Sequence, residues 1–217
     1  MIFISKINII ILLNKLLFDN MSEEESGIKV ILLGESSVGK TCLIKVAIGK
    51  KFNSSELTTY SANYSIKKFN YNGKEYTFNL WDTIGQEKYR ALTKMFFKDS
   101  KIIILVYDIT AEKSFKELEY WYNQVVNELG KEGYYLAIVG NKKDLYNEEK
   151  IKEDQGKKFA ESKKAKFKLT SAKDDPLSFN SLLEQMFKEF IDNNKDYLNN
   201  RKKTAITNKG KKKGKCC

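Results

Sequence analysis

Residues 34–41 read Gly34-Glu35-Ser36-Ser37-Val38-Gly39-Lys40-Thr41 and match the pattern G-x-x-x-x-G-K-[ST]. A β-rich apolar run at 29–33 precedes them and a helix-like segment at 41–49 follows, which is the setting this pattern requires. The glycines let the backbone curl so that N–H groups point at phosphate oxygens, and the helix N-terminus adds its dipole. We therefore predict a phosphate-binding loop in which Lys40 bridges the terminal phosphates and the Thr41 hydroxyl ligates Mg²⁺.

The rest of the chain alternates between strand-like and helix-like segments. Strand-like runs lie at 64–69, 76–80, 102–107, 136–139 and 167–169, and helical spacing at 114–129, 149–164 and 177–191. Asn72-Gly73 stands between the first two runs and is typical of a hairpin turn, because both residues tolerate positive φ. This order predicts an α/β fold: a mostly parallel central sheet of about six strands, with one antiparallel hairpin edge and helices on both faces.

Composition narrows the possible chemistry. The chain has 217 residues, a net charge of +11 and no histidine, which excludes Ser-His-Asp or Cys-His catalysis and metal sites that need imidazole. Its three cysteines are Cys42, Cys216 and Cys217, which form no disulfide framework. Most of the excess charge lies at 201–217, where basic residues occur without any acidic one. Such a tail predicts an arm for an anionic surface, either a membrane or a nucleic acid.

A second phosphate-side element follows the run at 76–80. Asp82 ends an apolar strand, where a carboxylate can hold Mg²⁺ beside the phosphate-binding loop. Gly85 allows its backbone N–H to approach a γ-phosphate closely. The amide of Gln86 is suited to orient an attacking water.

Two polar tetrads predict a base-binding site. Asn141-Lys142-Lys143-Asp144 follows the run at 136–139, and a carboxylate at Asp144 can accept two hydrogen bonds from the N1–H and 2-amino groups of guanine. Adenine lacks this pair of donors, so Asp144 would select GTP over ATP. We expect Asn141 to tie this loop to residues 34–41 and the Lys142 stem to cover the base. Thr170-Ser171-Ala172-Lys173 ends the next strand, where the Ala172 N–H can reach guanine O6.

These motifs, in this order, resemble those of the Ras superfamily of small GTPases, and the Rab branch matches best. Tyr89-Arg90-Ala91-Leu92-Thr93, Tyr107-Asp108-Ile109-Thr110, Trp81 and the terminal Cys216-Cys217 support the resemblance. It covers residues 27–194 and the tail. It implies the small-GTPase P-loop fold, with GTP/GDP and Mg²⁺ as ligands.

The resemblance also assigns roles residue by residue. The implied catalytic residues are Gln86, Lys40 and Gly85, and the implied metal ligands are Thr41, Thr59 and Asp82. The implied nucleotide-binding residues are Gly34, Glu35, Ser36, Ser37, Val38, Gly39, Lys40, Thr41, Cys42, Phe52, Thr59, Gly85, Asn141, Lys142, Asp144, Ser171, Ala172 and Lys173. Tyr64, Trp81 and Phe96 match the aromatic positions that Rab proteins present to effectors, although aromatic residues are more often part of a core.

The chain departs from the family pattern near the switch regions. Ile84 replaces the usual alanine, Tyr60-Ser61 replaces Ile-Gly, and Phe96-Phe97-Lys98-Asp99 replaces Tyr-Tyr-Arg-Gly. The leading interpretation is a Mg²⁺-dependent GTPase that regulates vesicle trafficking, hydrolyses GTP slowly and recruits effectors in its GTP state. Ile84 supports the alternative of a nucleotide-binding pseudo-GTPase scaffold with little turnover. A P-loop ATPase or kinase is a more distant alternative.

The two ends of the chain have different expected roles. We expect residues 1–26 to be an N-terminal extension, either disordered or an artefact of the gene model, and a weak interfacial helix is the second choice for residues 1–20. We expect residues 27–194 to form the GTP-binding domain and residues 195–217 to form a basic flexible tail. The resemblance implies that Cys216 and Cys217 carry prenyl groups, which anchor stably as a pair, and the lysines at 209–215 add attraction to anionic leaflets. It also implies an exchange factor, an activating protein, effectors and a prenyl-dependent chaperone. The expected location is the cytoplasmic face of intracellular membranes, with a cytosolic pool and no nucleic-acid partner.

Overall fold

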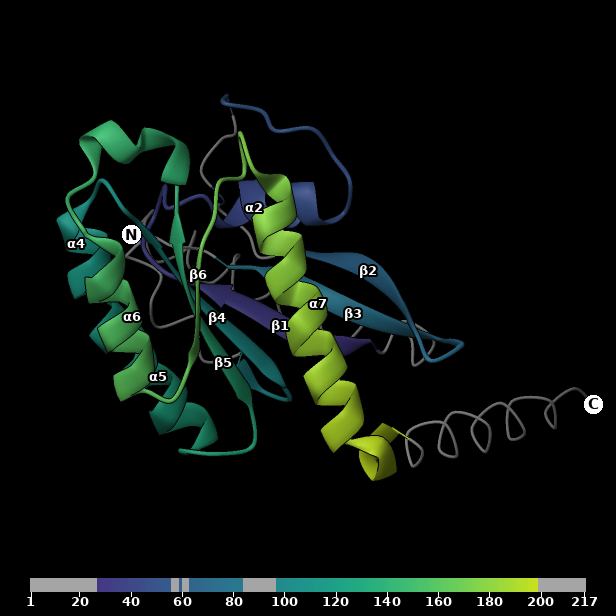
Figure 1. Cartoon of the computed structure of the whole chain (residues 1–217). Helices are drawn as coiled ribbons and strands as arrows, with labels where there is room; N and C mark the ends of the chain where they lie inside the picture. The colour runs from purple at the N-terminus through teal and green to yellow at the C-terminus, as the bar shows by residue number, and fades with distance from the viewer. Residues whose placement is uncertain (1–26, 56–58, 60–62, 84–96, 199–217) are drawn as a thin grey trace, which may run out of the picture.

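The computed structural model describes residues 27–55, 59, 63–83 and 97–198 (Figure 1). The strands are β1 (Ile28–Leu33), β2 (Asn63–Tyr71), β3 (Lys74–Asp82), β4 (Ile102–Asp108), β5 (Tyr135–Asn141) and β6 (Lys166–Leu169). The helices are α2 (Lys40–Ala47), α4 (Glu112–Lys116), α5 (Leu118–Leu129), the 3₁₀ helix η3 (Lys143–Glu148), α6 (Glu153–Ser162) and α7 (Pro176–Asn193).

The strands form one six-stranded sheet in the order β2-β3-β1-β4-β5-β6. Only β2 and β3 pair antiparallel, whereas β3-β1-β4-β5-β6 are parallel neighbours. The sheet has helices on both faces, so the predicted fold class is confirmed. All residues of β4 are buried, as expected for a central parallel strand covered on both sides.

Two apolar clusters hold the helices to the sheet. On one face, α2 and α7 lie side by side (Figure 1). Phe187 of α7 stacks there on Phe78 of β3, with 3.6 Å between ring centroids. On the other face, α4, α5 and α6 cover β4 and β5, with Trp121 and Leu118 in the core. Burial of this apolar surface on both faces is the main stabilising contribution to the sheet.

The hairpin at one edge of the sheet forms as its turn residues predict. Asn72 and Gly73 have φ values of 51° and 70°, and Tyr71 pairs directly with Lys74. Positive φ at both central residues is the backbone of a tight two-residue hairpin turn. This turn fixes the register of β2 on β3, and therefore the level at which both strands reach the site.

Two helix predictions need correction. The helix expected at 114–129 is divided into α4 and α5, because Glu117 has a ψ of −8° and interrupts regular helix geometry. The helix expected at 149–164 begins only at Glu153, after Glu149 leaves η3 with an extended backbone. There the Gln155 side chain accepts a hydrogen bond from Lys152 N at 2.9 Å, which caps α6. The charged residues between 143 and 152 carry no apolar periodicity, so η3 was missed.

The parallel strands bring their carboxyl ends to one edge of the sheet. Leu33, Asp82, Asp108 and Asn141 end β1, β3, β4 and β5, respectively. Polar side chains far apart in the sequence therefore meet there, which is the usual ligand-binding edge of an open α/β sheet. Among the residues described, no helix is long and apolar enough to cross a membrane.

Candidate nucleotide-binding site

The loop between β1 and α2 needs both of its glycines. Gly34 and Gly39 have φ values of 145° and 97°, in the region that favours glycine. A Cβ at Gly34 would collide with the Val106 carbonyl oxygen, and one at Gly39 would collide with the Asn141 Nδ2. The loop is thus packed tightly against β4 and β5 before it enters α2.

Lys40 fills the loop from inside. Its Nζ donates hydrogen bonds to the carbonyl oxygens of Gly34 at 2.9 Å and Glu35 at 2.8 Å, and the residue is only 6% exposed. Burial lowers the pKa of Lys40 to about 8, although the carboxylates of Asp82 and Glu35 act in the opposite direction. The ammonium group is held where an anionic ligand would stabilise its charge.

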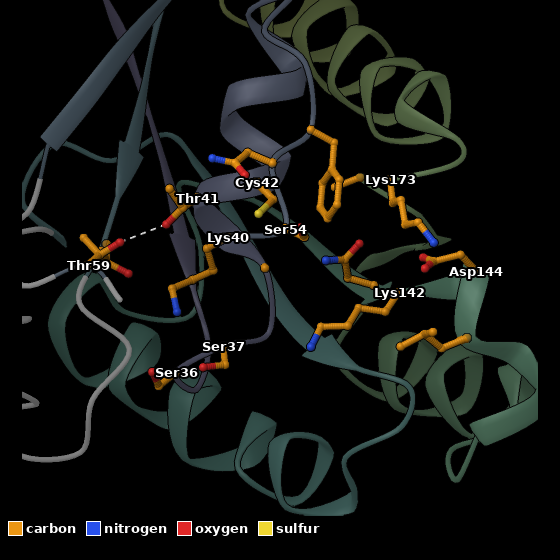
Figure 2. Close-up of a pocket in the computed structure, with 17 residues that line it drawn as sticks. Ser36, Ser37, Lys40, Thr41, Cys42, Ser54, Thr59, Lys142, Asp144 and Lys173 are labelled. Atoms are coloured by element: carbon orange, nitrogen blue, oxygen red, sulfur yellow. Dashed lines mark hydrogen bonds between the residues drawn. The ribbon is translucent and has the colours of Figure 1, made fainter. Parts of the chain in front are cut away.

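Three oxygen-bearing side chains meet beside the loop. Thr41 Oγ1 donates a hydrogen bond to Asp82 Oδ2 at 2.7 Å, and Thr59 Oγ1 donates to the same oxygen at 3.2 Å. The two threonine oxygens lie 2.8 Å apart and share a hydrogen bond, drawn as a dashed line in Figure 2. Hydroxyl and carboxylate oxygens are the ligands that Mg²⁺ prefers. The structure thus brings together the three residues predicted to hold the metal.

This oxygen cluster has too few carboxylates to hold a metal alone. Within the described ranges, no group of three or more His, Cys, Asp or Glu side chains is placed to bind a metal ion. Mg²⁺ in nucleotide sites is commonly held by one or two carboxylates together with substrate phosphates and water. The residues present fit that mode of binding.

The base side of the site is a network of side chains. Ser171 Oγ donates to Asp144 Oδ1 at 2.6 Å and accepts a hydrogen bond from Asp174 N at 2.9 Å. These bonds orient the Asp144 carboxylate. Lys142 Nζ forms an ion pair with Asp108 Oδ2 at 2.7 Å.

Asn141 connects the base side to the phosphate side. Its side chain is buried, and Nδ2 donates to the Val38 carbonyl oxygen at 2.8 Å. Its Oδ1 accepts from Thr170 Oγ1 at 3.2 Å. One amide therefore joins the phosphate-binding loop to the ends of β5 and β6, the contact expected from the sequence.

A cavity of about 530 Å³ runs between these two groups of residues (Figure 2). The predicted residues that line it are Ser36, Ser37, Gly39, Lys40, Thr41, Cys42, Phe52, Thr59, Asn141, Lys142, Asp144, Ala172 and Lys173. Five other predicted residues are absent from the lining: Gly34, Glu35, Val38, Asp82 and Ser171. They bond instead to Lys40, Asn141, Thr41 or Asp144.

Sequence reasoning missed four lining residues: Asn53, Ser54, Thr83 and Leu145. Each follows a predicted site residue by one or two positions, and that adjacency was the only available signal. The implied catalytic pair Gly85 and Gln86, together with Ile84 and Phe96, lies outside the described residues, as do Cys216 and Cys217. Of the aromatic positions, Tyr64 stacks on Trp81 at 5.1 Å between centroids, and Trp81 is only 2% exposed.

The sheet order, the glycine loop around a buried lysine and the adjoining oxygen cluster define a P-loop nucleotide-binding protein. The Ras family model matches residues 29–195. The chain is 42% identical to the Ras-related protein Rab-21 of Bos taurus over 159 residues, which cover 73% of this chain and 69% of the relative. It is 37% identical to the Ras-related protein SEC4 of Saccharomyces cerevisiae over 179 residues, covering 81% and 82%, respectively. The chain belongs to the Rab branch of the Ras superfamily of small GTPases.

Proposed function

We propose that this chain is a Mg²⁺-dependent GTPase switch of intracellular vesicle trafficking. The observation that carries the proposal is the position of Asp144, which lines the same cavity as Lys40 and is oriented by Ser171. A fixed carboxylate can accept hydrogen bonds from the N1–H and 2-amino groups of guanine, and a buried ammonium group stabilises phosphate charge. The cavity thus has a hydrogen-bond acceptor suited to guanine, Asp144, and a hydrogen-bond donor suited to phosphate, Lys40.

The chain's own residues divide the chemistry between them. Lys40 would exchange its bonds to two carbonyl oxygens for bonds to the terminal phosphates. Thr41, Thr59 and Asp82 would hold Mg²⁺, which when bound neutralises charge on the phosphates. Gln86 would orient the attacking water and Gly85 would offer its N–H to the γ-phosphate. Hydrolysis would be slow without a partner, because the chain has only two arginines, Arg90 and Arg201, and neither follows a motif that would place it on the phosphates.

The proposed switch extends to the membrane. Thr59 lies within hydrogen-bond distance of Thr41 and Asp82, so the loop that carries it reaches the proposed Mg²⁺ site. Loss of the γ-phosphate beside that metal would alter this loop. Effectors would bind the GTP-dependent arrangement. Prenyl groups on Cys216 and Cys217, with the basic tail, would hold the protein on the cytoplasmic face of intracellular membranes. The relatives named above are Ras-related proteins, one of them Rab-21, which supports this role.

Nucleotide competition with single-turnover hydrolysis tests the enzymatic part. The purified protein is first loaded with labelled GDP. Excess unlabelled GDP or GTP should displace the label, whereas excess ADP or ATP should not. Bound GTP should be hydrolysed only when Mg²⁺ is present. Displacement by ATP, or retention of GTP without any turnover, would contradict the proposal.

Fractionation of cells tests the membrane part. The double substitution Cys216→Ser with Cys217→Ser should move an N-terminally tagged protein from membranes to the soluble fraction, because two lipid chains supply most of the anchoring free energy. Nucleotide affinity should be unchanged. A double-serine variant that stays on membranes would assign the attachment to another part of the chain.

A further inference from the structure

Asp108 ends β4, beside the end of β5, and its side chain is held in a single orientation. It pairs directly with Asn141 in the parallel register of β4 and β5 and is 6% exposed. Its Oδ1 accepts hydrogen bonds from Thr110 N and Thr110 Oγ1, both at 2.8 Å. Its own backbone N–H donates to Ser114 Oγ at 3.0 Å. These contacts aim the second carboxylate oxygen, Oδ2, at Lys142 Nζ, 2.7 Å away.

Lys142 needs such an anchor. Its φ of 66° is unusual for a residue with a side chain, and that side chain is 32% exposed. Figure 2 shows its stem extending along the cavity from the side of Asp144 towards the phosphate-binding loop. A free lysine side chain samples many rotamers, so an unanchored stem would lose conformational entropy each time a base packed on it.

We propose that Asp108 is a positioning residue of the guanine-nucleotide site. It holds the Lys142 ammonium so that the aliphatic stem is already placed under the base, and it thereby slows nucleotide release. Asp108 is absent from the cavity lining, so it acts through Lys142 and without touching the nucleotide. The inference rests on the proposed function, because it takes guanine to be the base beside Lys142.

A purely structural role for Asp108 is chemically separable from this one. The turn at 108–110 uses Oδ1, whereas the contact with Lys142 uses Oδ2. Asp108→Asn keeps a carbonyl acceptor for Thr110 and replaces the other oxygen by an amide nitrogen, which cannot accept from an ammonium group. The substitution therefore removes the anchor and leaves the turn.

The test is the release rate of a fluorescent GDP analogue from the full chain in excess GDP and Mg²⁺. Asp108→Asn should release the analogue about tenfold faster, because the nucleotide must then immobilise a lysine side chain that Asp108 no longer holds. Lys142→Met should have a similar effect, and the double variant should release no faster than Lys142→Met alone. Lys142→Arg keeps a cation for Asp108 and should stay closer to the unsubstituted protein. Glu119→Gln breaks the Lys163–Glu119 ion pair outside the cavity and is the matched control, with unchanged release.

Several outcomes would overturn the proposal. Unchanged or slower release from Asp108→Asn would do so, as would an equal acceleration by Asp108→Asn in the Lys142→Met background. If Asp108→Asn does not fold, Thr110→Val removes only one bond to Oδ1; its smaller acceleration must then disappear in the Lys142→Met background. Failure of the unsubstituted protein to retain the GDP analogue would contradict the proposed function, and that result is distinguishable from all of these.

Discussion

The two ends of the cavity are built in opposite ways. At the phosphate end, Lys40 bonds to carbonyl oxygens only six and five residues earlier in the same loop. At the base end, Ser171 bonds to Asp144 across 27 residues, and Thr170 bonds to Asn141 across 29. The loop around Lys40 is a local backbone structure, whereas the oxygen cluster beside it draws on the distant residues Thr59 and Asp82. The base end exists only when β5 and β6 are paired in register, so it depends on the whole sheet.

The two ends also differ in whether a ligand would compensate for an unfavourably buried charge. The buried Lys40 is destabilised as a cation, as its pKa of about 8 shows, and phosphate would compensate for that burial. The Asp144 carboxylate already has a hydroxyl donor in Ser171. Binding at the phosphate end is therefore expected to depend on charge, and binding at the base end on hydrogen-bond pattern.

Lys40→Met should have the largest effect. Guanine-nucleotide affinity should fall on the order of a thousandfold, because charge-assisted hydrogen bonds to two phosphate groups are lost. The thermal midpoint of the nucleotide-free protein should not fall, since the substitution also removes an unfavourably buried ammonium group. Calorimetric titration with GDP and thermal unfolding measure the two quantities. A variant that binds GDP normally would remove Lys40 from the phosphate end.

Asp144→Asn should have the second-largest effect. GDP affinity should fall about a hundredfold, as expected when two hydrogen bonds to the base lose their charged acceptor. The preference should shift towards xanthine nucleotides, whose 2-oxo group can accept a hydrogen bond from the new amide. Competition between GDP and xanthosine diphosphate is the measurement. Equal loss for both nucleotides would mean that Asp144 acts on stability and not on base choice.

The contrast between the two ends explains how far sequence alone reaches. The phosphate-binding loop is contiguous, so the glycine spacing and Lys40 could be recognised directly. The helix boundary at Glu153 and the helix η3 could not, because the charged residues before them carry no apolar period. Likewise, nothing near Asp108 in the sequence points to Lys142: their contact follows from the register that sets Asp108 opposite Asn141. Asn53 and Ser54 were missed because their place in the cavity depends on the path of a loop.

Asn141→Ala would disconnect the two ends. The buried amide bonds to Val38 of the loop and to Thr170 after β6, so its loss removes both links. We expect the free energy of unfolding to fall by about 1–3 kcal/mol, the usual cost of unsatisfied buried polar groups. GDP affinity should fall about tenfold, because one end would no longer orient the other. An affinity loss with unchanged thermal stability would contradict this shared role.

The smallest effect concerns the pH dependence of GDP affinity and distinguishes Lys40 from Lys29, a lysine that is only partly buried. Burial lowers the pKa of both Lys40 and Lys29 to about 8. The proposed function has phosphate bind the protonated form of Lys40, so GDP affinity should be full below this pKa and decline as pH rises through it. Between about pH 7 and 8.5 the protonated fraction of such a group falls roughly fourfold, and affinity should fall by the same factor.

Lys29→Met is the matched control for this pH effect. The Lys29 ammonium donates to the Lys98 carbonyl oxygen at 3.0 Å and lies 4.8 Å from the centroid of the Trp81 ring. Lys29 is absent from the cavity lining, so this substitution should leave the decline of GDP affinity with pH in place. Calorimetric titrations at several pH values, on both proteins, are the measurement. If the decline of affinity with pH disappears in Lys29→Met, the titrating group is Lys29 of β1 and not Lys40. If GDP affinity is independent of pH in both proteins, the Lys40 ammonium is not the group that phosphate stabilises.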